Sequence, residues 1–323
     1  MTNLFDGLRN DIKGKNKKIV FPEGSDERII EAASRLASEN LITPILLGKD
    51  SDIADNAHGA DLSKVKIVDI NNYPKDEYEE MLDALEERRN GKNTREQLSE
   101  WLNNENYFGT MLVYMGKADG MVSGAAHATG DTVRPALQII KTKKGMRRIS
   151  GSFLMQKGDT RYVFADCAIN LELDAAGMVE VAKQSADTAK MFGIDPKVAF
   201  LSFSTKGSAK GEMVTKVQEA AKIAQDELAC PSDGELQFDA ALMPEVAKKK
   251  APTSAVAGNA NVFVFPELQS GNIGYKIAQR LGGFEAFGPI LQGMAKPVSD
   301  LSRGCNAEDV YNVSIITAAQ SLK

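Results

Sequence analysis

The chain has 323 residues, and at about 150 residues per domain this length predicts two domains. Hydrophobic residues make up 43% and charged residues 26%, a balance that excludes a largely disordered chain. Lys and Arg (39) are outnumbered by Asp and Glu (44), and the net charge of −5 disfavours a dedicated nucleic-acid binder. Phosphate-bearing small molecules remain possible ligands, because a few arginines can set the potential of a cleft.

Cysteine and histidine are scarce in this sequence. Cys167, Cys230 and Cys305 lie too far apart for a CxxC zinc pair or a disulfide framework, so we expect a reducing, cytoplasmic compartment. Two histidines cannot build a three-histidine metal site. The N-terminal segment lacks the apolar core of a signal peptide, and no apolar run has the length of a membrane span. We therefore expect no membrane association.

Strands and helices alternate along the first half, which predicts a parallel sheet covered by helices. Ligands of such sheets bind at the carboxyl ends of the strands. The expected strands span residues 19–22, 45–47, 65–70 and 118–123, and the expected helices span residues 29–36, a short stretch near 53, and residues 76–89, 96–115 and 136–141.

The pattern changes near Gly145, where two strand-like segments flank a turn at residues 156–160 and indicate a β-hairpin. We place a domain boundary there. The α/β alternation then resumes, with expected helices at residues 175–192, 213–227 and 307–322 and expected strands at residues 198–203, 236–238 and 262–265.

The loop at residues 123–135 has the chemistry of an anion site. Ser123, Thr129 and Thr132 supply hydroxyls, Arg134 supplies a guanidinium, and a helix start supplies backbone N–H groups. The same residues also fit a capped helix with a surface arginine, so both interpretations stay open.

A second polar loop, at residues 202–210, carries hydroxyls, a glycine and two lysines after a predicted strand. It suits a ligand at the carboxyl edge of a sheet and equally a polar turn with solvated lysines. His127 stands alone in its loop and is interpreted as a structural hydrogen-bond donor. The sequence contains neither a GxxxxGK[ST] loop nor a GxGxxG motif after a strand, which excludes the common nucleotide sites.

Residues 301–309 concentrate a hydroxyl, a guanidinium, a thiol and two carboxylates before the last helix. The alternative is a capped helix, in which Asn306 is the N-cap and Glu308 and Asp309 favour the helix dipole. Cys305 has no histidine nearby in the sequence, so a nucleophilic role is disfavoured.

Seven segments together resemble the phosphate acetyltransferase (phosphotransacetylase) family, which interconverts acetyl-CoA plus phosphate with acetyl phosphate plus CoA. The resemblance implies two α/β domains of the isocitrate and isopropylmalate dehydrogenase type, with an active-site cleft between them. Residues 1–144 plus 295–323 would form the first domain, and residues 145–294 the second. The segments that carry the resemblance are KIVFPE (18–23), DGMVSGAAH (119–127), DTVRPALQ (131–138), SFSTKGSAK (202–210), DGELQ (233–237), GNIGYKIAQR (271–280) and DLSRGC (300–305).

The resemblance also implies catalytic roles. Asp309 corresponds to a general base that takes the CoA thiol proton, Arg303 to the arginine that stabilises developing negative charge, and Ser302 to its hydroxyl neighbour. The thiolate then attacks the acetyl carbonyl directly in a ternary complex, with no metal and no tightly bound cofactor. CoA, acetyl-CoA, acetyl phosphate and phosphate are the implied substrates, and a homodimer is the implied assembly.

Substrate-binding roles follow from the same resemblance. Arg88 and Arg134 correspond to arginines that bind CoA or phosphate, and Ser123 belongs to the same substrate-binding set. Thr129 stands where the family usually has serine and keeps the hydroxyl. Gly130 also departs from the usual residue without removing a functional atom.

Three alternatives remain at this point. A phosphate butyryltransferase differs only in acyl-chain length, which the sequence does not reveal. A metal- and NAD-dependent decarboxylating dehydrogenase shares the fold, but it requires clustered aspartates that this sequence lacks. The third alternative is a non-catalytic CoA-binding protein.

Overall fold

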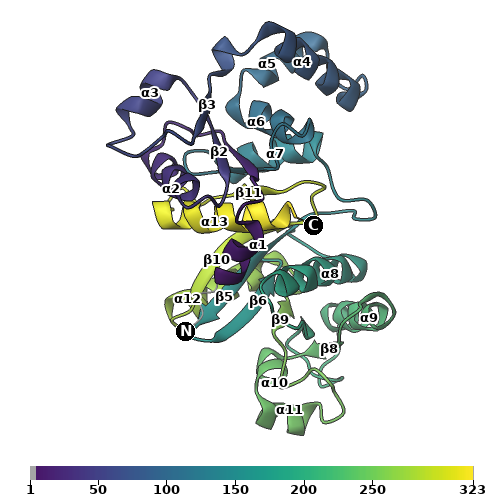
Figure 1. The fold of residues 1–323 in the computed structure, drawn as a ribbon. Helices are drawn as coiled ribbons and strands as arrows, with labels where there is room; N and C mark the ends of the chain where they lie inside the picture. Colours follow the sequence, from purple (N-terminus) through teal and green to yellow (C-terminus); the bar gives the residue numbers. More distant parts are fainter. Residues whose placement is uncertain (1–4, 323) are drawn as a thin grey trace. The chain divides into compact units, whose positions relative to one another are not determined.

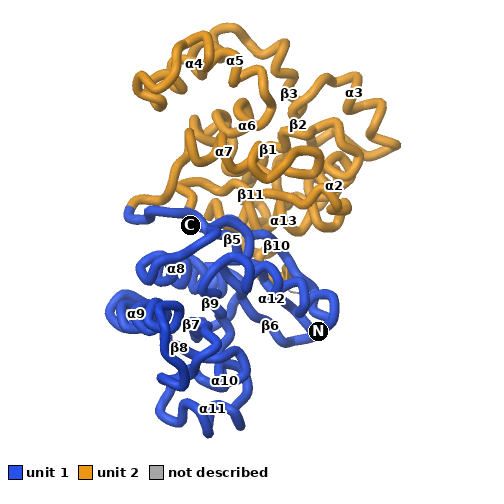
Figure 2. Tube along the Cα trace, turned by 180° about the vertical axis from the view of Figure 1, so that it is seen from behind, with its two compact units in different colours: residues 1, 145–293 blue, residues 2–144, 294–323 orange. Residues whose placement is uncertain are grey.

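The computed structural model describes residues 5–322 and divides into two compact units (Figures 1 and 2). Unit 1 comprises residues 145–293, and unit 2 comprises the described residues up to 144 together with residues 294–322. The chain therefore leaves unit 2 once and returns to it at its C-terminal end.

Unit 2 is built on a five-stranded parallel sheet with the strand order β11-β4-β1-β2-β3. The central residues Ile19, Val20 and Phe21 are fully buried, as expected for a parallel sheet covered on both faces. The strands are β1 (Lys18–Phe21), β2 (Thr43–Leu47), β3 (Lys66–Val68), β4 (Gly120–Ser123) and β11 (Val298–Asp300).

The helices of unit 2 include the C-terminal one, which packs against β1, β4, β11 and α2 and is buried throughout residues 310–319 (Figure 1). This helix therefore packs the C-terminal end of the chain against elements from its first half. The helices are α1 (Asp6–Ile12), α2 (Glu27–Ser38), α3 (Asp50–Asp55), α4 (Lys75–Arg89), α5 (Arg95–Leu102), α6 (Glu105–Tyr114), α7 (Thr129–Ile139) and α13 (Ala307–Gln320), with a 3-10 turn η1 (Ile70–Asn72).

Two helix predictions in this unit are wrong. Residues 96–115 form two helices, because the Asn104 side chain accepts the N–H groups of the next turn and starts a new helix. The helix expected from residue 136 begins at Thr129 and contains Pro135. Proline removes one backbone hydrogen bond inside a helix, but the buried face that includes Thr132 and Ile139 keeps α7 intact.

Unit 1 contains a mixed six-stranded sheet with the strand order β10-β5-β6-β9-β7-β8. The hairpin prediction is confirmed, since β5 and β6 are antiparallel and pair Lys157 with Thr160 beside the turn. β10 pairs antiparallel with β5, and the remaining pairs are parallel. The strands are β5 (Ser150–Lys157), β6 (Thr160–Ala165), β7 (Val198–Leu201), β8 (Ser232–Leu236), β9 (Val262–Val264) and β10 (Glu285–Gln292).

The helices of unit 1 enclose an aromatic core in which Phe164 packs edge-on against Phe263 with ring centroids 5.5 Å apart. The prediction of a strand at residues 236–238 is wrong in position, because β8 ends at Leu236 and a helix begins at Phe238. The helices are α8 (Ala175–Met191), α9 (Glu212–Glu227), α10 (Phe238–Leu242), α11 (Pro244–Lys250) and α12 (Leu268–Arg280).

Candidate active site

The carboxyl ends of three neighbouring strands meet at one edge of the unit 2 sheet. β1 pairs with β4 at Val20 and Met121, and β4 pairs with β11 at Ser123 and Asp300. The segments that follow these strands therefore lie close together, at the edge where ligands of parallel sheets bind.

Glu23, two residues after β1, holds the loop that follows β4. Its carboxylate accepts backbone N–H groups from Gly124 (3.0 Å), Ala125 (2.8 Å), Ala126 (2.7 Å) and His127 (2.9 Å). The imidazole Nδ1 of His127 also lies 2.7 Å from this carboxylate. These N–H groups thus face an internal carboxylate, and ionised acceptors of this kind make short, strong hydrogen bonds. The side chain of His127 is a structural partner of Glu23, as its interpretation from the sequence predicts.

Arg28, in the first turn of α2, joins this loop to the one after β11. Its guanidinium forms a bidentate pair with Asp26 at 2.7 and 2.9 Å. It also donates to the carbonyl of Ala125 at 2.9 Å and to the carbonyls of Arg303 (2.9 Å) and Cys305 (3.0 Å). One side chain therefore fixes two loops that are far apart in the sequence.

Asp300, the last residue of β11, provides a second link between these segments. Its side chain is 2% exposed, and Oδ2 accepts the Thr129 hydroxyl at 2.7 Å. Burial raises the pKa of Asp300 to about 6, with a further increase from the charge of Glu23, while the hydroxyls of Thr129 and Thr132 lower it. A buried carboxyl that titrates near neutrality thus lies directly beneath the start of α7.

Gly124 makes this close approach possible. Its φ of +112° is a conformation that favours glycine, and a Cβ here would lie 2.6 Å from both Asp300 Oδ1 and the Leu301 carbonyl oxygen. Any larger residue would separate the two loops.

The predicted catalytic residues Ser302, Arg303 and Asp309 are all exposed. Asp309 and Asn306 form a capping box: Asn306 Oδ1 accepts the Asp309 N–H at 2.9 Å, and Asp309 Oδ2 accepts the Asn306 N–H at 3.0 Å. The capping interpretation of this segment is therefore confirmed. It leaves the second oxygen of the Asp309 carboxylate for other partners.

Cys305 has the environment of a structural thiol. It is 8% exposed, and burial raises its pKa, an effect that the nearby Arg28 only partly opposes. Its Sγ lies 3.7 Å from the Arg28 guanidinium. A thiol with a raised pKa is a weak nucleophile, which agrees with the interpretation from the sequence.

The predicted substrate-binding residues of the first polar loop differ in their surroundings. Thr129 is exposed in the first turn of α7, and Arg134 reaches back over that turn, since a Cβ on Gly130 would lie 3.9 Å from its Nη2. Ser123 is fully buried, and its hydroxyl donates to Asn106 Oδ1 at 2.7 Å. In this structure Ser123 supports the loop from the interior, while Thr129 and Arg134 are exposed and the Thr129 hydroxyl turns inward to Asp300.

Arg88 lies at the opposite end of α7. It donates to the carbonyls of Ile139 (2.5 Å) and Ile140 (3.0 Å), which are unpaired groups at a helix C-terminus. Arg89 donates to the carbonyl of Gln138 next to them. The charges of these arginines lower the pKa of the neighbouring Lys141, so this end of α7 carries a cluster of cations.

The second polar loop, after β7 in unit 1, is held by its own side chains. Glu235 accepts the Gly207 N–H at 2.7 Å and the Ser204 hydroxyl at 2.9 Å, and Lys206 pairs with Asp233 at 2.5 Å. These contacts favour the interpretation as a polar turn over the interpretation as a ligand loop.

The described residues of unit 2 line at least two cavities. One, of about 390 Å³, lies at the ends of β1 and β2 and is lined by Glu23, Asp26, Lys49 and His127 among others. Carboxylates dominate its wall, which disfavours a phosphate there.

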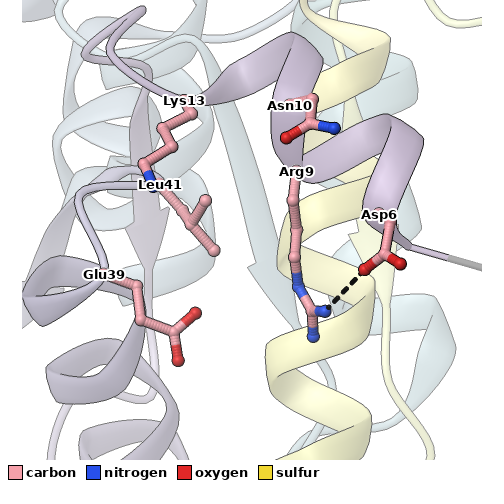
Figure 3. A pocket seen from close by; sticks show the side chains of 6 residues that line it. All are labelled: Asp6, Arg9, Asn10, Lys13, Glu39 and Leu41. Atoms are coloured by element: carbon pink, nitrogen blue, oxygen red, sulfur yellow. Dashed lines mark hydrogen bonds and ion pairs between the residues drawn. The ribbon is translucent and has the colours of Figure 1, made fainter. Parts of the chain in front are cut away.

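Figure 3 shows the other cavity, of about 560 Å³, where Arg9 of α1 pairs with Asp6 at 3.5 Å. Lys13 and Glu39 complete a wall of balanced charge. None of the predicted site residues lines either cavity. Within residues 5–322, no group of three or more His, Cys, Asp or Glu residues is arranged to hold a metal ion, and no helix is both long and apolar enough to cross a membrane.

Sequence reasoning missed three residues that organise this site: Glu23, Arg28 and Asp300. Glu23 and Asp300 each lie at or just beyond the end of a buried strand, which is the signal that identifies them. Arg28 carries no such signal, because the two loops that it joins lie 97 to 277 residues away along the chain.

The fold defines an α/β protein of the dehydrogenase-like type, in which polar loops meet at the carboxyl ends of β1, β4 and β11. The family model described as phosphate acetyl/butaryl transferase matches residues 3–318. The phosphate acetyltransferase of Staphylococcus epidermidis is 59% identical over 332 residues, covering 100% of both chains. A crystal structure of a phosphotransacetylase from Streptococcus pyogenes is 58% identical and superposes with a TM-score of 0.96, covering 99% of this chain and 98% of that one.

The chain belongs to the phosphate acetyl/butaryl transferase family. This confirms the family resemblance and the enzyme class, an acyltransferase. The dehydrogenase-like α/β fold is confirmed as well, since a structure described as a 4-hydroxythreonine-4-phosphate dehydrogenase from Salmonella typhimurium superposes with a TM-score of 0.55 at 12% identity, covering 95% of this chain and 99% of that one.

Proposed function

We propose that this chain catalyses the reversible transfer of an acetyl group between CoA and inorganic phosphate. The observation that carries the proposal is the junction of two polar loops at the carboxyl ends of β4 and β11, held by Arg28 and Asp300. This junction supports a site in which Thr129 contacts phosphate while Arg303 contacts the reacting acyl group. Acetyl-CoA is a substrate in this proposal, and no tightly bound cofactor is required.

The chemical step is a direct acyl transfer. The CoA sulfur forms a bond to the acyl carbon, the bond from that carbon to the phosphate oxygen breaks, and the thiol proton passes to Asp309. Full transfer of a proton from a thiol (pKa ~8.5) to an ordinary aspartate (pKa ~3.9) costs about 6 kcal/mol. Arg303 reduces this cost by stabilising the thiolate and the oxyanion, and bound substrates supply the desolvation that strengthens the base.

Binding of the two anionic substrates is divided between the ends of α7. Thr129, the guanidinium of Arg134 and the positive end of the helix dipole suit the phosphoryl group. Arg88 and Lys141 belong to the cation cluster at the other end, about 15 Å away along the helix, which suits a phosphate of CoA. Ser123 supports the first of these two positions from beneath.

The test is the phosphate-dependent loss of the acetyl-CoA thioester absorbance. Asp309→Asn is expected to lower kcat by ~10²-fold or more with little change in either KM, because general-base catalysis is lost. Arg303→Gln is also expected to lower turnover. Glu308→Gln is the matched control, since it removes an exposed carboxylate from the same helical turn.

Two results would refute parts of this proposal. A folded protein that does not consume acetyl-CoA in the presence of phosphate would exclude the activity. An unchanged kcat in Asp309→Asn would remove Asp309 from the role of base. Comparing acetyl-CoA with butyryl-CoA tests acyl-chain length, and full-length relatives named phosphate acetyltransferase favour the acetyl group.

We also propose a homodimer that acts in the cytoplasm. Ile273, Ile277 and Leu281 form an exposed apolar stripe along one face of α12 and its end, and such stripes favour self-association. Three free thiols suit a reducing compartment. Light scattering should give twice the mass of the chain, and Ile277→Glu should reduce it to the monomer mass; a monomeric wild type contradicts the dimer.

A further inference from the structure

Asp300 is a buried carboxyl with one oxygen satisfied and one unsatisfied. Its Oδ2 accepts the Thr129 hydroxyl at 2.7 Å, while Oδ1 is buried without a hydrogen-bond partner among residues 5–322. The fully buried Thr132 hydroxyl has no partner at ordinary hydrogen-bond geometry within the same range, but it lies close enough to the carboxyl to lower the pKa of Asp300 as a weak hydrogen-bond donor. The proposed acyl transfer assigns no role to Asp300 Oδ1 or to the Thr132 hydroxyl.

Asp300 is less completely hydrogen-bonded than Glu23, the other buried carboxylate at this edge of the sheet. Glu23 is similarly buried, and each of its two oxygens accepts at least two hydrogen bonds. A carboxylate that serves only to hold a loop is satisfied in that way, because an unsatisfied buried acceptor costs free energy. The ionised form of Asp300 is satisfied at Oδ2 alone, because Oδ1 has no partner among residues 5–322.

The hydroxyl of Thr129 has a single proton to donate. When Asp300 is ionised, that proton points at Asp300 Oδ2, and the hydroxyl offers only lone pairs to solvent. When Asp300 is protonated on Oδ2, it donates that proton to the Thr129 oxygen, and the hydroxyl proton of Thr129 is free to point outward. A phosphate dianion accepts hydrogen bonds and cannot donate them, so it binds the second arrangement better than the first.

We propose that Asp300 is a positioning residue that sets the direction in which the Thr129 hydroxyl donates, and that it thereby links binding of the phosphoryl anion to the uptake of one proton. The inference rests on the proposed function, in which Thr129 contacts phosphate.

The groups around Asp300 agree with this role. The neutral hydroxyls of Thr129 and Thr132 face it from α7, the backbone of Gly124 and Leu301 closes it in, and the carboxylate of Glu23 acts on it from the end of β1. Burial first and then the charge of Glu23 raise its pKa to about 6, so the proton is exchanged close to neutral pH. A bound anion adds a further negative charge and favours the protonated form.

The experiment measures binding of inorganic sulfate, which remains a dianion throughout this pH range. Calorimetry in two buffers of different ionisation enthalpy reports both affinity and proton uptake. For the wild type, the sulfate Kd is expected to rise with pH above about 6, by up to about tenfold for each pH unit, with proton uptake approaching one.

Three variants isolate the linkage. Asp300→Asn keeps an acceptor and adds an N–H that donates to Thr129 at every pH, so the sulfate Kd should become flat from about pH 6 to 8. Thr129→Val, an exposed change that does not depend on refolding of the interior, should bind sulfate more weakly and also with a flat profile. Thr129→Ser should restore the slope of the wild type.

Specific outcomes overturn the inference. Parallel profiles for the wild type, Asp300→Asn and Thr129→Val would exclude the linkage, and so would a folded wild type that shows no saturable sulfate binding. If the wild type binds sulfate with proton uptake but does not transfer acetyl groups, the proposed function is refuted and the role of Asp300 stands. If the protein transfers acetyl groups but the phosphate KM of the wild type, Asp300→Asn and Thr129→Val varies with pH in the same way, the role of Asp300 is refuted and the proposed function stands.

Discussion

Replacement of Asp300 by asparagine should stabilise the protein more at neutral pH than at acidic pH, when the variant and the wild type are compared at the same pH. The pKa of Asp300 is about 6 in the folded chain, and 3.8 is its ordinary value. At about 1.36 kcal/mol for each tenfold change in proton affinity, this difference corresponds to about 3 kcal/mol. The folded state holds the proton more tightly than the unfolded state, so stability is lost as pH rises from 3.8 through about 6.

Asparagine removes this loss because it stays neutral at every pH, and it preserves the shape of the side chain. The free energy of unfolding of Asp300→Asn, compared with that of the wild type, should therefore increase by about 2.5 kcal/mol between roughly pH 4 and pH 7.5, because about 0.5 kcal/mol is already lost at pH 4. Urea unfolding at a series of pH values measures the difference, with fluorescence and circular dichroism followed in parallel.

Asp11→Asn is the matched control, since it removes an exposed carboxylate from the same unit. Its stability difference from the wild type should vary little with pH over the same interval. A difference between Asp300→Asn and the wild type that stays constant from acid to neutral pH would show that Asp300 is solvated, and the account of a desolvated carboxyl would be wrong.

Three further substitutions test the contacts that hold the site. Glu23→Gln should lower the free energy of unfolding by about 2–3 kcal/mol in urea titrations, because an amide cannot accept from all of the loop N–H groups; an unchanged midpoint contradicts this. Arg28→Lys cannot reproduce a forked guanidinium and should reduce kcat/KM by about tenfold or more, whereas wild-type kinetics would show that the loop junction is irrelevant. Cys305→Ala should retain most activity and show ternary-complex kinetics, and a folded but inactive variant would favour a covalent acyl-enzyme.

Local signals in the sequence were sufficient for much of the fold. The Asn306 cap, the turn between β5 and β6 and the buried strand β1 all rest on residues close together in the chain. The start of α7 was missed because Pro135 is usually read as a helix boundary. In the structure the buried face of the helix outweighs the one lost hydrogen bond.

The site was harder to predict than the fold, for a physical reason. Thr129 and Arg134 carry recognisable chemistry in a loop after a strand, so the pattern alone makes them candidates. Arg28 and Asp300 act through partners on other segments, and their contacts depend on the order of strands in the sheet. No periodicity or spacing specifies that order. The interior position of Ser123 depends on Asn106 in the same way.

The carboxylate of Glu23 already occupies the backbone donors of the loop after β4. The shape of this loop is thus acquired when the chain folds, before any substrate binds. A loop that is already hydrogen-bonded loses less entropy when an anion docks than a loop that must become ordered on binding, and this saving applies to both directions of a reversible transfer.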